Sequence, residues 1–152
     1  MLNKLFEGRG VSLQYTPHKK PYLEGETERI SISHSHDKLV IIVNSEQNTG
    51  VDVELLRDKI KNIKHKYLNE AELLFSGEKV DLLTILWAAK ESIYKAYGLK
   101  EVEFKENIFI EPFNADENNF YGRMDLPNFK KRYLMHYKRI DNYILVYILS
   151  EV

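Results

Sequence analysis

The sequence predicts an α+β fold in which an antiparallel sheet packs against one long central helix. Segments with alternating apolar and polar residues, typical of strands, come before residue 55 and again after residue 106. Between them, from about Val80 to Tyr97, apolar residues recur three and four positions apart, the spacing of a buried helical face. We expect an irregular N-terminal arm over residues 1–29 and a single domain over residues 30–152.

The overall composition indicates a globular protein without disulfides. Of its 152 residues, 43% are hydrophobic and 30% are charged, and the formal net charge is −1, so we expect no nucleic-acid partner. The absence of Cys excludes disulfides and thiolate metal ligands. No apolar run approaches the ~20 residues of a membrane span, and Glu7 and Arg9 interrupt any signal-peptide pattern. We therefore expect a cytoplasmic protein with no membrane partner.

The first third of the chain is expected to contain the irregular arm and then three strands. Gly and Pro recur through the N-terminal arm and leave Val11–Tyr15 as its one short strand. The domain then begins with a hairpin whose turn is His34–Asp37, because the residues on either side alternate or are β-rich. The two hairpin strands and a third strand are expected at Arg29–Ser33, Lys38–Val43 and Gly50–Glu54.

Two helices and four strands are expected in the rest of the chain. The first helix begins at Asn69, where Glu72 completes a capping-box pattern, and ends at Phe75. The long helix ends at Gly98, a residue suited to a helix C-terminus. The strands are Asn107–Glu111, Phe120–Asp125, Arg132–Ile140 and Tyr143–Leu149, with the hairpin turn Asp141-Asn142 between the last two. We expect core packing from their apolar stripes, Tyr133, Met135 and Tyr137 on one strand and Tyr143, Leu145, Tyr147 and Leu149 on the other.

Three acidic residues are candidates for a metal site. Asp52 and Glu54 are two apart on a strand, so their side chains share a face. Glu91 lies on the long helix between Lys90 and Lys95, which supply positive charge for phosphate oxygens. Alone, Glu91 and Lys95 would be a surface pair worth a few tenths of a kcal/mol. Together the three carboxylates suit Mg²⁺ and indicate phosphate chemistry.

Four short motifs, in order and at fitting spacings, resemble those of a known family. They are Lys20-Pro21, Ser33-His34-Ser35, Gly50-Val51-Asp52-Val53-Glu54 and Trp87-x-x-Lys90-Glu91-Ser92-x-x-Lys95. Together they resemble the 4′-phosphopantetheinyl transferase superfamily, closest to the surfactin-synthetase-activating type. Members of that type are built as two similar halves. Only about 30 residues precede Ser-His-Ser here, so we expect most of the N-terminal half to be missing.

The resemblance implies an enzyme of the holo-[acyl-carrier-protein] synthase type. Such enzymes transfer the 4′-phosphopantetheine group from coenzyme A, a co-substrate, to a serine of an acyl or peptidyl carrier protein, depend on Mg²⁺ and release 3′,5′-ADP. On that likeness Asp52, Glu54 and Glu91 hold Mg²⁺. The catalytic residues are Glu91, which takes the serine proton itself or through a metal-bound water, and Lys95, which neutralises the phosphates. The residues that bind coenzyme A are Lys20, Ser33, His34, Lys90 and Lys95.

The resemblance also bears on partners and assembly. The segment Arg57–Lys66 carries five Lys or Arg residues. It is either a solvated face or a patch for an acidic carrier protein. Two-half relatives bind coenzyme A between their halves, and the short family type binds it between subunits. Because this chain has one full half, we expect a homo-oligomer, a dimer or a trimer, with the site at a subunit boundary.

Three other interpretations stay open on the sequence. His34, His36 and Asp37 could bind zinc, although a His pair two apart in a turn is common by chance. The chain could be a catalytically degenerate module that binds coenzyme A or a carrier protein. It could also be an unrelated Mg²⁺-dependent phosphotransfer or nuclease fold that uses the same three acids.

Overall fold

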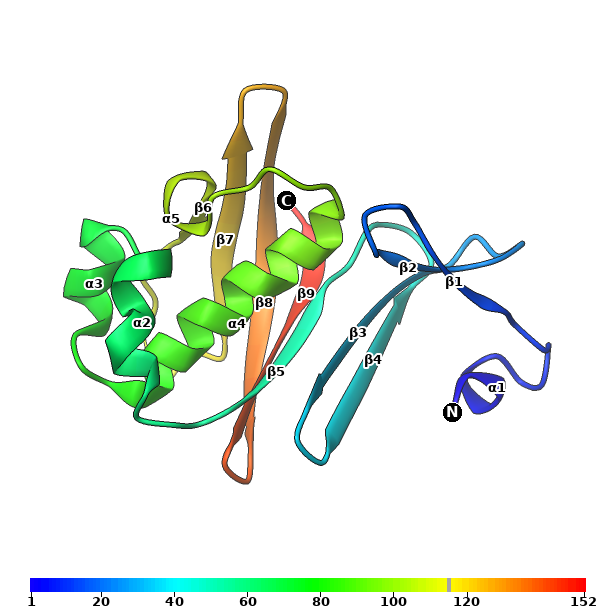
Figure 1. The fold of residues 1–152 in the computed structure, drawn as a ribbon, viewed down its shortest axis with the longest axis horizontal. Coiled ribbons are helices and arrows are strands. Elements are labelled where there is room, and N and C mark those ends of the chain that lie inside the picture. Colours follow the sequence, from blue (N-terminus) through cyan, green and yellow to red (C-terminus); the bar gives the residue numbers. More distant parts are fainter. Residues whose placement is uncertain (115) are drawn as a thin grey trace.

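A computed structural model of the chain, which describes residues 1–114 and 116–152, contains a five-stranded antiparallel sheet with a helix across one face (Figure 1). The strand order is β5-β9-β8-β7-β6. The strands are β5 (Val51–Leu55), β6 (Ile108–Ile110), β7 (Asn119–Leu126), β8 (Phe129–Ile140) and β9 (Tyr143–Glu151). All neighbouring strands pair antiparallel. The predicted mixed fold with an antiparallel sheet is confirmed.

Helix α4 (Val80–Tyr97) lies diagonally across the sheet in Figure 1. It has 18 residues, and its apolar residues three and four positions apart are buried, namely Leu82, Ile85, Leu86, Ala89, Ile93 and Ala96. They share one core with the inward residues of β7, β8 and β9. The helix ends where the sequence predicts, because Gly98 takes a left-handed conformation with φ of 74°. This packing fixes which face of α4 looks toward β5.

Three shorter helices lie beside α4. They are α2 (Ile60–Tyr67), α3 (Glu70–Ser76) and α5 (Phe104–Asn107). The predicted cap of α3 is confirmed: the Glu72 backbone N–H donates to Asn69 Oδ1 at 2.9 Å, and the Asn69 backbone N–H donates to Glu72 Oε2 at 3.0 Å. The Glu72 side chain is thereby fixed at the start of α3, pointing into the core.

The N-terminal region forms a smaller lobe next to β5. It contains α1 (Leu2–Leu5), β1 (Leu13–Tyr15), β2 (Pro21–Leu23), β3 (Arg29–Ser35) and β4 (Lys38–Asn44). The strands form two hairpins, β1–β2 and β3–β4. Phe6, Leu23 and Ile30 make a second, small core there. The sequence predicted β1 but not β2, which begins at a Pro, a residue that argues against a strand in a sequence pattern.

Two local expectations are wrong. The hairpin turn is His36-Asp37 rather than His34–Asp37, because β3 continues to Ser35 and His34 pairs with Leu39. On β9 the apolar stripe that enters the α4 core is Ile144, Val146 and Ile148. The alternate stripe of Leu145, Tyr147 and Leu149 lies on the opposite face, and Leu149 is 39% exposed. Both faces of β9 are apolar, so period alone could not choose between them.

A buried ion pair joins the helices to the edge of the sheet. Lys90 on α4 is fully buried, and its Nζ donates to Glu72 Oε2 at 2.8 Å and to the backbone oxygens of Tyr67 and Phe104. The other oxygen of Glu72 accepts from the Ile110 backbone N–H at 2.9 Å. The predicted contact of Lys90 with coenzyme A phosphates is therefore wrong, because all three ammonium donors are used inside the core.

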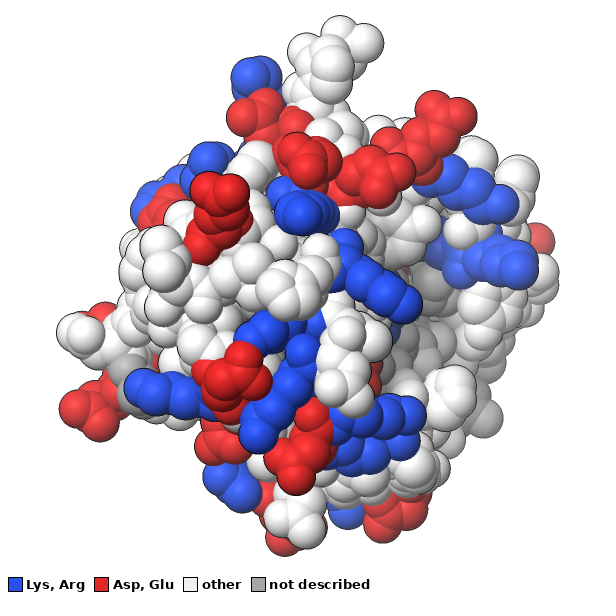
Figure 2. Space-filling model, turned by 60° about the vertical axis from the view of Figure 1, so that its left-hand side comes forward, with Lys and Arg blue, Asp and Glu red and all other residues white. Residues whose placement is uncertain are grey.

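The basic segment forms most of α2 and carries charges of both signs around it. Figure 2, which brings the α2 and α3 side forward, shows blue and red side chains interspersed. Lys61 lies 3.7 Å from Asp58, and Lys64 is paired with Glu78. Lys59 and Lys66 are exposed. Among the helices in the described part of the chain, none combines the length and apolar character needed to cross a bilayer.

The ion pair predicts a large stability effect at Lys90. Lys90→Met should destabilise the fold by about 3–5 kcal/mol, because it leaves the Glu72 carboxylate buried without its cation. Urea unfolding followed by circular dichroism measures this change. The double variant Lys90→Met/Glu72→Gln should recover part of the loss, since it leaves no buried charge and its amide oxygen still accepts one of the two backbone N–H bonds. A single variant as stable as the wild type would contradict the role of the pair.

Candidate active site

The chain passes close to helix α4 at Gly50, the residue just before strand β5. A Cβ at this position would lie 1.8 Å from the backbone oxygen of Ser92, so only Gly fits without moving the helix. The Ser92 hydroxyl in turn lies 3.1 Å from the backbone oxygen of Val146 on β9. This contact sets the start of β5 against the turn of α4 that carries Glu91 and Lys95.

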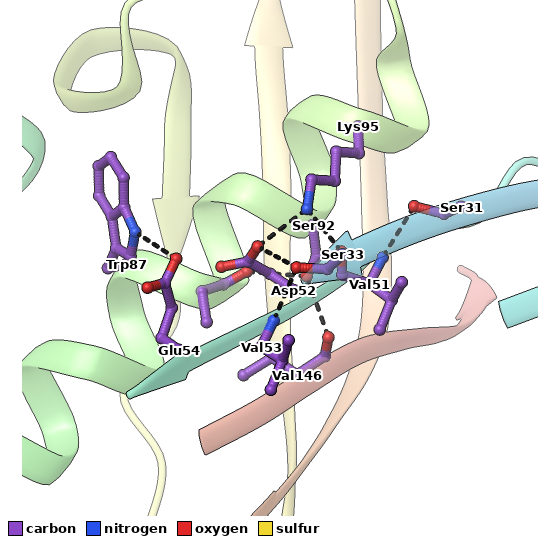
Figure 3. Close-up of polar contacts among 11 residues, drawn as sticks. Ser31, Ser33, Val51, Asp52, Val53, Glu54, Trp87, Ser92, Lys95 and Val146 are labelled. Atoms are coloured by element: carbon purple, nitrogen blue, oxygen red, sulfur yellow. Dashed lines mark hydrogen bonds and ion pairs between the residues drawn. The ribbon is translucent and has the colours of Figure 1, made fainter. Parts of the chain in front are cut away.

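Asp52 is the centre of the candidate site. The residue is 4% exposed, and its Oδ1 accepts from Lys95 Nζ at 2.8 Å and from Ser33 Oγ at 3.0 Å (Figure 3). Its Oδ2 is buried and has no hydrogen-bond partner among the residues that the structure describes. A buried carboxylate oxygen without a donor is costly, so this oxygen has capacity for a cation.

Glu54 and Glu91 lie near enough to Asp52 to feel its charge. Burial, and then the charge of Asp52, raise the pKa of Glu54 from 4.5 to about 8. Burial and the same charge raise the pKa of Glu91 to about 7, against the opposing effect of Lys95. The Trp87 Nε1–H donates to Glu54 Oε1 at 3.0 Å. Lys95 is the cation bonded to Asp52. Its single positive charge does not balance the charges that Asp52, Glu54 and Glu91 carry when all three are ionised.

These carboxylates fit a hard divalent cation in part. No three Asp, Glu or His side chains in residues 1–114 and 116–152 come together as a complete metal-binding group. Mg²⁺, however, uses one or two carboxylates and takes its other ligands from water and substrate phosphates. The unpartnered Asp52 Oδ2 and the raised pKa values of Glu54 and Glu91 reflect uncompensated negative charge, which a bound cation would offset.

The serines of β3 have a structural role at this site. Ser31 Oγ accepts from the Val51 backbone N–H at 3.2 Å, and Ser33 Oγ accepts from the Val53 backbone N–H at 3.1 Å. These hydroxyls satisfy the outer edge of β5, where the backbone has no neighbouring strand. Ser33 also donates to Asp52, so it is engaged inside the protein rather than presented to a phosphate. His34 is exposed, and its contact with coenzyme A stays a prediction.

The zinc interpretation finds no support in the β3–β4 turn. His34 and His36 are exposed. Asp37 instead accepts a hydrogen bond from the Tyr143 hydroxyl at 2.7 Å and lies 3.5 Å from the ammonium of Lys38. The Tyr143 bond holds the pKa of Asp37 below its ordinary value. These three side chains are thus not gathered into a zinc site.

A cleft of about 260 Å³ opens beside Lys95, between the β1–β2 hairpin and the C-terminal end of α4. Lys20 lies in its wall, with Nζ 2.7 Å from the Ala96 backbone oxygen and 3.3 Å from Asn48 Oδ1. Burial lowers the pKa of Lys20. The cleft brings Lys20 and Lys95, predicted from distant parts of the sequence, to one cavity.

Sequence reasoning missed other residues of this cleft. Its lining includes two aromatic side chains and two further basic or polar ones, Tyr15, Tyr94, His18 and Lys19. A signal for two of them was present, because His18-Lys19-Lys20 is a run of basic side chains beside a Pro. Tyr15 and Tyr94 gave no signal, since each resembles an ordinary packing residue of a strand or helix. The lysines of the cleft suit an anionic group, and its tyrosines suit a ring attached to that group.

Comparison with known proteins agrees with this geometry. A model of the 4′-phosphopantetheinyl transferase superfamily matches residues 48–148. The match contains Asp52, Glu54, Glu91 and Lys95, whereas Lys20, Ser33 and His34 precede it. A search among curated proteins found no match.

Metal-free stability should depend on pH through Glu54. Its pKa rises on folding from 4.5 to about 8, so the folded chain holds a proton that the unfolded chain releases. The associated stability is full below about pH 4.5 and is lost as the pH rises through about 8. In EDTA, Glu54→Gln should therefore gain melting temperature over the wild type as the pH is raised from about 5 to about 8.5.

Thermal melts of the two proteins across this range provide the measurement, with Glu24→Gln at an exposed strand-end position as the matched control. The control should follow the wild type at every pH. Added Mg²⁺ should raise the wild type most at high pH, where the carboxylates are charged. Parallel curves for wild type and Glu54→Gln would contradict the raised pKa.

Proposed function

The chain belongs to the 4′-phosphopantetheinyl transferase superfamily, and we propose that it transfers 4′-phosphopantetheine from coenzyme A to a serine of an acyl or peptidyl carrier protein, with Mg²⁺ and release of 3′,5′-ADP. The observation that carries the proposal is the arrangement around Asp52. One of its oxygens is bound by Lys95 beside a basic cleft, and the other is buried without a partner. This arrangement suits a cation shared with substrate phosphates.

In this proposal Asp52, Glu54 and Glu91 would hold the Mg²⁺, with water and substrate phosphates completing its ligands. A bound Mg²⁺ supplies charge neutralisation to the diphosphate of coenzyme A. Lys95, whose side chain is 27% exposed at the cleft, neutralises a further phosphate oxygen. Its ammonium is held by Asp52 and the Val51 backbone oxygen, so it is aimed before substrate arrives.

The reaction needs one proton transfer. The carrier serine oxygen attacks the β-phosphorus of coenzyme A, a new P–O bond forms, and the bond to 3′,5′-ADP breaks. The serine proton passes to Glu91. Without a cation, burial and the charge of Asp52 raise the pKa of Glu91 to about 7. A bound Mg²⁺ would lower this pKa, so Glu91 would be charged and able to accept a proton at neutral pH.

The cleft of Lys20 and Lys95 is the proposed place for the nucleotide end of coenzyme A. Its lysines offer positive charge to phosphate groups, and Tyr15 and Tyr94 offer ring faces to the adenine. Lys20 also bonds to the C-terminal turn of α4. It therefore ties the β1–β2 hairpin to the helix and gives the cleft its second wall.

Neutralising the acids should abolish transfer without unfolding the protein. Asp52→Asn and Glu91→Gln should each lower the rate by about 10²-fold or more, because both the cation and the proton acceptor depend on them. Mass spectrometry of an apo-acyl carrier protein incubated with coenzyme A and Mg²⁺ detects the added group. Asp141→Asn, at the exposed β8–β9 turn, is the matched control. A chain that binds coenzyme A but never modifies a carrier would favour the degenerate alternative.

Helix α2 is the proposed contact for the carrier protein. Because Lys61 and Lys64 have acidic neighbours, the exposed Lys59 and Lys66 are the better candidates to steer an acidic partner. Lys59→Glu/Lys66→Glu should raise the KM for carrier protein several-fold and leave that for coenzyme A unchanged. Steady-state kinetics at two ionic strengths measures both, with Lys100→Glu/Lys105→Glu as a charge-matched control. Equal effects on the two substrates would contradict the assignment.

A further inference from the structure

The only tryptophan of the chain makes a hydrogen bond to one of the three site carboxylates. Trp87 Nε1 donates to Glu54 Oε1 at 3.0 Å, and Figure 3 shows the indole reaching from α4 toward β5. A Trp on a helix that packs on a sheet is ordinarily a packing residue. Its ring does pack against core residues, yet its one polar atom is used on Glu54. An indole has a single donor, so this bond takes all of its hydrogen-bonding capacity.

Packing against two aromatic residues fixes the position of the indole. The ring centroids of Trp87 and Tyr67 are 5.1 Å apart, with the two rings edge-on, and those of Trp87 and Phe104 are 5.6 Å apart. Both neighbours are anchored by their own bonds, because the Tyr67 hydroxyl donates to the Leu83 backbone oxygen and the Phe104 backbone oxygen accepts from the buried Lys90. The Nε1–H is therefore directed at Glu54 by the core rather than by solvent.

Two electrostatic effects act on the position of the Glu54 carboxylate. The charge of Asp52 repels it. It also lines a cavity of about 240 Å³ whose other residues include Arg57 and Lys59. A carboxylate that is pushed from one side and attracted from the other turns toward the cations unless a donor holds it. Within the described part of the chain, the Trp87 Nε1–H is the side-chain group that donates to Glu54.

We propose that Trp87 is a positioning residue, whose Nε1–H keeps the Glu54 carboxylate beside Asp52 as a ligand for the divalent cation. The inference rests on the proposed function, since that function supplies the cation. It explains why a large aromatic side chain at the edge of the core presents its polar edge to the site. Outer-shell donors of this kind tune the orientation and affinity of metal-binding carboxylates.

The test measures metal binding rather than turnover. Mg²⁺ is titrated by calorimetry into wild type and Trp87→Phe, each saturated with coenzyme A and without carrier protein. Trp87→Phe keeps a ring between Tyr67 and Phe104 but removes the donor. Its dissociation constant for Mg²⁺ should rise by about 10-fold or more. Tyr97→Phe is the matched control, because Tyr97 lies on the same helix and packs against Phe129, away from the acids. It should bind Mg²⁺ as the wild type does.

A second readout keeps the inference testable if Trp87→Phe does not fold. In the wild type, Mg²⁺ should change the emission of the single tryptophan, and Glu54→Gln, which retains the indole, should greatly reduce that change. Equal Mg²⁺ affinity of Trp87→Phe and wild type would overturn the positioning role and leave the proposed function standing. A wild type that binds coenzyme A but no Mg²⁺ would overturn the metal role in the proposed function as well.

Discussion

The buried ion pair of Lys90 and Glu72 is the interaction on which the rest of the structure depends. Glu72 receives the backbone N–H groups of Asn69 and Ile110, and Lys90 donates to the backbone oxygens of Tyr67 and Phe104. Two side chains therefore connect the ends of α2, α3, α5 and β6 to the middle of α4. A charge removed from water in this way is tolerated only when every partner is present, so the pair penalises any other packing of these elements.

That anchor acts on the site through α4 and the aromatic residues around it. Lys90 immediately precedes Glu91, so fixing one side chain in the core turns the other toward β5. On the opposite side, the close approach of Gly50 to Ser92 sets the distance between strand and helix. The carboxylates of the site thus come from two rigid elements, and their mutual repulsion is resisted by packing rather than relieved by movement.

The site itself is a balance of like charges around one lysine. Repulsion alone suggests that removing Asp52 would stabilise the chain without metal. The structure argues otherwise, because Asp52 accepts bonds from both Lys95 and Ser33, and its loss would leave those donors unpaired. The unfavourable charge lies instead on Glu54 and Glu91, whose pKa values are raised to about 8 and about 7. Ser33, predicted to contact coenzyme A, holds Asp52 and β5 in place.

The sequence by itself determined the elements with a clear period or cap, and the acids that share a face. The capping box of Asn69, the stop at Gly98 and the pair Asp52 and Glu54 follow from local geometry, which a few neighbouring residues encode. Only the tertiary structure decided that Lys90 enters the core while Lys95 reaches Asp52, and that Lys20 meets the end of α4. These assignments depend on partners that are distant along the chain, and a lysine looks the same in sequence whether a buried carboxylate or solvent receives its charge.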